Sequence, residues 1–177
     1  MRRLVVFFSH LRDVLMGETG IGPIGSNQAP HFPVSLLKLT VMSICTFGIY
    51  EVYWFYKNWN LIKQREGTNI APFWRAVFGY FFCYQCFSRI RAHAESLGLH
   101  QSVPAGPLAT GWIITSLLWK LPDPYWLVSA LSFLFMLPVQ ALANRINSTI
   151  TPHHDPNRRF TVWNLVGAVV GAIFMYS

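Results

Sequence analysis

The sequence predicts an all-α integral membrane protein, and three observations carry that prediction. Hydrophobic residues make up 53% of the 177 residues and charged residues only 12%, about half of the roughly 25% that is usual in a soluble domain. The apolar residues gather into runs that short polar segments separate. Seven tryptophans recur near the ends of these runs, where the headgroup region accommodates an amphipathic ring. Together they favour four to five short transmembrane helices and an N-terminal amphipathic helix in the interface.

Residues 1–33 are expected to form that interfacial helix and a loop after it. Apolar side chains recur at helical spacing, opposite polar and charged ones (Leu4, Phe8, Leu11 and Leu15), which is typical of a helix lying along a membrane surface. Several glycines and prolines follow within residues 17–33, and this is loop composition.

The first hydrophobic stretch covers residues 34–56, with a break expected at Thr46–Gly48. Its charge-free part is short for a hydrocarbon core about 30 Å thick. Beyond the break, apolar side chains form one stripe (Val52, Phe55, Trp59 and Ile62), so this piece could lie along the surface. A helix over residues 73–95 should follow, with Pro72 in its first turn. The two segments either cross the membrane or form a re-entrant hairpin.

The second half contains clearer spans, at residues 108–119, 125–143 and 160–176. Pro138 is expected to kink the middle one. The polar run 144–159 is expected to be a loop.

The pattern T-x-G-I-Y-x-x-Y-W begins at Thr46, and Pro72–Ala76 follows as Pro-Phe-Trp-Arg-Ala. The chain here resembles a family of small bacterial inner-membrane proteins known only as a domain of unknown function. The resemblance covers about residues 34–96 and implies a multi-pass protein of the bacterial inner membrane. Together with the hydropathy pattern, this divides the chain into residues 1–33, a family-like membrane hairpin over 34–96 and C-terminal transmembrane helices over 97–177, to which the resemblance does not extend.

Glu51 and Arg75 are the most informative charges, because each flanks a short apolar core. A charge inside a bilayer costs roughly 2.5–3.5 kcal/mol on insertion scales, and pairing is the usual remedy. We therefore expect an intramembrane polar pair, which either lines an ion path or locks two helices together.

Two further sets of residues are candidates for interfaces. Aromatic side chains in the first half are expected to anchor it at the headgroup level (Tyr53, Trp54, Trp59 and Trp74). Gly167 and Gly171 form a GxxxG pattern in the last span, and small residues at this spacing let helix backbones approach closely. This pattern fits either packing within the chain or an interface with a partner or second copy.

Chemically active groups are present, but no catalytic constellation emerges from them. Cys83 and Cys86 form a C-x-x-C within an apolar helix, where thiols favour packing over redox chemistry. His153, His154 and Asp155 lie in a polar loop without a second cluster at metal-ligand spacing. An enzyme would need those histidines, or His93 and His100, to converge in space, so we expect no catalytic residues, metal or cofactor.

The sequence thus favours a non-enzymatic accessory, assembly or partner-binding subunit of a membrane system. The alternative is a small transporter or channel for lipid or ion that uses Glu51 and Arg75. The expected partners are the lipid bilayer and a membrane protein or second copy of the chain. Nucleic acid is not expected, although the net charge is +7, because the basic residues are scattered between apolar segments.

Overall fold

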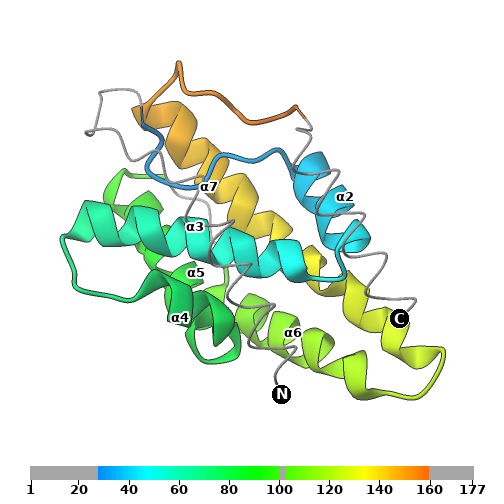
Figure 1. Cartoon of the computed structure of the whole chain (residues 1–177). Helices are drawn as coiled ribbons and strands as arrows, with labels where there is room; N and C mark the ends of the chain where they lie inside the picture. The colour runs from blue at the N-terminus through cyan, green and yellow to red at the C-terminus, as the bar shows by residue number, and fades with distance from the viewer. Residues whose placement is uncertain (1–27, 100–102, 160–177) are drawn as a thin grey trace.

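The computed structural model describes residues 28–99 and 103–159, and the regular structure in this part of the chain is entirely helical (Figure 1). This agrees with the all-α prediction. The elements in chain order are α2 (Leu36–Cys45), α3 (Ile49–Glu66), α4 (Pro72–Val77), α5 (Gly79–Ser96), α6 (Ala105–Leu117), the 3₁₀ helices η1 (Leu118–Lys120) and η2 (Tyr125–Phe135), and α7 (Leu137–Ile150).

The predicted break at Thr46–Gly48 is confirmed, since α2 ends at Cys45 and α3 begins at Ile49. Phe47 and Gly48 both have positive φ, at 46° and 85°. Glycine adopts such values without steric cost, whereas they are strained for phenylalanine. The two residues therefore reverse the chain direction and set Glu51 in the first turn of α3.

Helix α3 lies at the centre of the fold (Figure 1), and its apolar stripe faces the core. Phe55, Trp59 and Ile62 are fully buried, so the stripe was predicted correctly, but it packs against protein rather than lying along the surface. Trp54 is fully buried as well. The expected interfacial anchor role is therefore wrong for Trp54 and Trp59, because neighbouring helices cover both rings.

The other two expected anchors are placed differently. Tyr53 is half-buried against the core. Trp74 is 58% exposed on α4, the placement expected of a ring at an interface. Helix α4 ends at Val77 and α5 begins at Gly79, so the single helix expected over residues 73–95 is interrupted at Phe78.

Residues 28–35, which we call the strap, form a non-helical segment with a bend at residues 30–31, and α7 holds this segment through side-chain amides. Gln140 Nε2 donates to the carbonyl oxygens of Phe32 (3.1 Å) and Val34 (3.2 Å). Asn147 accepts from the His31 backbone N–H at 3.0 Å and donates to the His31 carbonyl at 2.9 Å. These bonds satisfy buried backbone groups of a segment that belongs to neither a helix nor a sheet.

Helix α7 carries these amides and runs through residues that were expected to form a loop. The helix continues past Asn144 to Ile150, so the prediction of a loop over 144–159 is wrong for its first half. Asn144 Nδ2 donates to the Val34 carbonyl at 2.9 Å. Pro138 lies in the first turn of α7, at the junction with η2.

Within the described residues, one helical stretch is long and apolar enough to cross a membrane, at Tyr125–Ile150. The described helices therefore do not support four to five crossings. Helices α2 and α6 have 10 and 13 residues, short of the roughly 20 that a span needs. The expected interfacial helix falls mainly in residues 1–27, and Gly167 and Gly171 lie near the other end of the chain, all outside the described residues.

Large apolar side chains are exposed along the hairpin that α6 and η2 form. Soluble monomers rarely expose wide contiguous apolar patches, so this face favours contact with lipid or with another apolar surface. Its members with more than two-fifths of their surface exposed are Ile114, Leu117, Trp119, Leu121, Tyr125, Leu127, Val128, Leu131 and Leu134.

Candidate functional site

Glu51 is the centre of the candidate site, and three elements position its carboxylate. It projects from the first turn of α3, where the helix dipole favours negative charge. Trp112 Nε1 of α6 donates to Oε2 at 2.6 Å, and Ser132 Oγ of η2 donates to Oε1 at 2.8 Å. The side chain is therefore fixed although only 2% of the residue is exposed.

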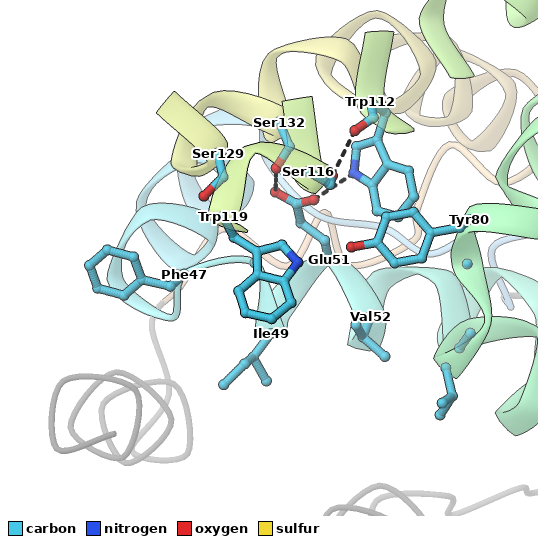
Figure 2. Close-up of a pocket in the computed structure, with 14 residues that line it drawn as sticks. Phe47, Ile49, Glu51, Val52, Tyr80, Trp112, Ser116, Trp119, Ser129 and Ser132 are labelled. Carbon is cyan, nitrogen blue, oxygen red and sulfur yellow. Dashed lines mark hydrogen bonds between the residues drawn. The ribbon is translucent and has the colours of Figure 1, made fainter. Parts of the chain in front are cut away.

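A cavity of about 250 Å³ adjoins this carboxylate. Figure 2 shows Tyr80, Trp112 and Trp119 grouped around Glu51, with the hydroxyls of Ser129 and Ser132 above it. The described residues that line the cavity are Phe47, Gly48, Ile49, Glu51, Val52, Ala76, Val77, Gly79, Tyr80, Trp112, Ser116, Trp119, Ser129 and Ser132.

The cavity contains an acid that faces no base in its described lining. Glu51 is the one acid among the described lining residues, and none of them is Lys, Arg or His. Removing an ion from water costs several kcal/mol after relaxation, whereas each hydrogen bond to a charged group returns about 1.5–3 kcal/mol. The indole and hydroxyl donors together return about 3–6 kcal/mol, which offsets much of this cost, and a positive charge or a proton in the cavity would balance the carboxylate completely.

Arg75 does not supply that charge, so the structure does not form the expected Glu51–Arg75 pair. The Arg75 guanidinium lies 4.6 Å from the centroid of the Trp59 ring and 4.9 Å from that of Phe82. It also donates to Gln85 at 2.9 Å. Arg75 therefore contacts aromatic rings instead of the expected acid, because an aromatic face attracts a cation.

A second polar cluster joins His31 of the strap to the C-terminal ends of α3 and α5. His31 Nε2 and His93 Nδ1 are 2.9 Å apart, and Arg65 Nη1 lies 3.2 Å from each of these nitrogens. Glu66 binds both Arg65 and Arg89. Sequence reasoning noted His93 but missed His31 and Arg65, because the contacts join residues far apart in the chain.

This cluster lowers the pKa of both histidines. Burial, then the charge of Arg65, then His93 hold the pKa of His31 well below its ordinary value. Burial and Arg65 likewise lower the pKa of His93, with Glu66 opposing. A proton on either ring would place a second positive charge beside the Arg65 guanidinium, and the repulsion between like charges disfavours this.

The remaining chemical groups do not join either cluster. His153 and Asp155 are exposed in the loop after α7, and His154 binds the Thr151 carbonyl through Nδ1. Cys83 and Cys86 are buried free thiols, as expected for cysteines that pack as small apolar residues. His100 lies outside the described residues.

The sequence identified Glu51 but none of its partners. Trp112 and Ser132 lie 61 and 81 residues further along the chain, and neither side chain differs in type from many others in the apolar runs. One signal was available, since a glutamate in an otherwise apolar stretch needs donors from other elements. No protein-family model, curated protein or solved structure matches the chain.

Proposed function

We propose that the chain is a non-enzymatic membrane protein, a small carrier or channel, and that the Glu51 cavity is its cation-binding site. The observation that carries the proposal is the buried carboxylate in a cavity whose described lining holds no balancing base. An intramembrane acid is a hypothesis of function by default, and here a cavity adjoins it. The resemblance over residues 34–96 and the bacterial inner membrane remain predictions about family and location.

The membrane setting is supported by the apolar stretch Tyr125–Ile150 and by the exposed face of the α6–η2 hairpin. Ser132 belongs to this stretch, so one wall of the cavity would be formed by the membrane-crossing helix. We propose further that the hairpin enters the bilayer as a pair, with the Lys120–Asp123 turn at one surface. The accessory or partner-binding role remains a prediction, and the same apolar face could bind such a partner.

The test is whether cations stabilise the protein through Glu51. A ligand present at 100 times its dissociation constant adds about 2.7 kcal/mol to the free energy of unfolding. The unfolding temperature of detergent-solubilised protein would be measured against sodium, potassium and choline chlorides at constant ionic strength. We expect at least one cation to raise it, and Glu51→Gln to abolish the increase.

Asp123→Asn is the matched control. Asp123 also accepts an indole N–H, from Trp126 at 2.5 Å, but it is exposed at the hairpin turn. This variant should keep the full cation response. The proposal is refuted if none of the three cations acts, or if Glu51→Gln responds like the unmodified chain. Proteoliposome flux of the cation that binds would then separate a carrier or channel from a binding protein.

A further inference from the structure

The walls of the Glu51 cavity are aromatic where they meet the surface. Trp119 is 59% exposed and Tyr80 is 38% exposed, while Trp112 is nearly buried beside the carboxylate. The Tyr80 and Trp112 rings lie 5.5 Å apart with planes 36° from parallel. Figure 2 shows these three side chains around one acid. Ring faces attract cations, and their apolar surface also favours alkyl groups.

This lining fits a divalent metal ion poorly. Calcium takes six to eight oxygen ligands and magnesium six, but the described lining offers a single carboxylate. Both of its oxygens already accept a hydrogen bond, from Trp112 and Ser132. Within residues 28–99 and 103–159, no three His, Cys, Asp or Glu side chains gather as a metal site would require.

The size of the cavity also points to a small organic cation. An apolar protein cavity of roughly 150 Å³ holds benzene, and drug-sized ligands occupy about 300–1,000 Å³. At about 250 Å³, this cavity is too large for a bare ion and suits a methylated ammonium group with a short tail.

We propose that the Glu51 cavity binds an alkylated ammonium group, with Glu51 as its counter-charge and the Tyr80, Trp112 and Trp119 rings around its methyl groups. The proposal rests on the proposed function and names its ligand class. The Lys120 ammonium lies 5.6 Å from the centroid of the Trp119 ring, so the ligand would contact the part of this ring that Lys120 leaves open. The same chemistry occurs in free choline-like solutes and in the headgroup of phosphatidylcholine.

The experiment compares choline with 3,3-dimethylbutan-1-ol, which has the same shape without the charge, and with ammonium, which has the charge without the methyl groups. The full chain would be solubilised in a maltoside detergent and its unfolding temperature followed against each compound. We expect choline to bind at least tenfold more tightly than either. Binding by the neutral alcohol or by ammonium as tight as that of choline would overturn the proposal.

Two exposed tryptophans provide a matched pair of variants. Trp119→Leu should weaken choline binding about tenfold, because it removes a ring from the cavity wall. Trp74→Leu removes a ring of nearly equal exposure, 58%, that does not line the cavity, and it should leave binding unchanged. Equal effects of the two variants would contradict the ring contacts, even if Glu51→Gln fails to fold.

A last comparison identifies the source of the ammonium group. Short-chain phosphatidylcholine and phosphatidylglycerol would be added to separate samples, beside free choline. Stronger stabilisation by phosphatidylcholine than by either of the others assigns a lipid headgroup, and stronger stabilisation by choline assigns a solute. If sodium or potassium acts through Glu51 while no alkylammonium compound does, this inference fails and the proposed function stands; if no cation acts, both fail.

Discussion

Replacing Gly111 of α6 by alanine tests the packing of the hairpin that carries the Glu51 cavity. A methyl group at this position would overlap Cδ1 and Cε1 of Phe135 and would lie 2.8 Å from Cζ. Phe135 is the last residue of η2, so its ring rests on the glycine at the crossing of the two helices. The ring must move, or the helices must separate.

The expected magnitude follows from two opposing effects. Forcing extra volume into a packed contact costs about 1–3 kcal/mol, whereas alanine in place of glycine within a helix gains about 0.5–1 kcal/mol. Gly106 in the same helix is the control, because its methyl would meet only Tyr84 Cε2, at 4.0 Å. The helix-propensity gains largely cancel between the two variants, so Gly111→Ala should be less stable than Gly106→Ala by about 1–3 kcal/mol.

Thermal unfolding followed by far-ultraviolet circular dichroism in detergent would measure the difference. A loss of 1 kcal/mol lowers the unfolding temperature by about 2–4 °C for a chain of this size, so the two midpoints should differ by roughly 2–12 °C. Adding Phe135→Leu to Gly111→Ala should recover most of the loss. If Gly111→Ala is as stable as Gly106→Ala, then Phe135 does not rest on Gly111 and the hairpin packing described here is wrong.

Three further predictions concern the strap and the buried thiols. Folding lowers the pKa values of His31 and His93, so below pH about 6.5 the unfolded state binds more protons than the folded state. The free energy of unfolding should therefore decrease as the pH is lowered below this value. In a series of unfolding temperatures measured against pH, His93→Gln should make this decrease smaller. Gln140→Leu should lower the free energy of unfolding by roughly 1–3 kcal/mol for each buried group left without a partner. A decrease below about 1 kcal/mol, measured by denaturant unfolding, would contradict the bonds to the strap. Maleimide should label the exposed Cys45 in native protein but Cys83 and Cys86 only after denaturation, and mass spectrometry that locates a label on Cys83 or Cys86 of native protein would show that these two thiols are accessible.

Local features of the fold could be predicted because their causes are local. The break at Thr46–Gly48 follows from the conformational freedom of glycine, and the stripe at Phe55, Trp59 and Ile62 follows from helical periodicity. Glu51 could be singled out because an acid in an apolar stretch must find partners. The solvated loop at His153 also follows from its composition.

The failures concern pairings between distant residues. The amphipathic rings of Trp54 and Trp59 predict a place in the headgroup zone, but their burial depends on which helices cover them. The polarity of the run after Asn144 predicts a loop. Gln140, Asn144 and Asn147 are in fact spaced as one face of a helix, and that face holds the strap backbone. A polar stripe on a helix can therefore mark a bound segment as well as solvent.

This arrangement has a consequence for the order of assembly. The strap is made before all the other described residues, yet several of its backbone groups are satisfied only by α7, between 106 and 116 residues later. Contacts across such separations form slowly, since the intervening chain must first be closed into a loop. A nascent chain that stops short of α7 thus leaves these peptide groups unsatisfied, and the last of the described helices is the one that encloses the first of the described residues.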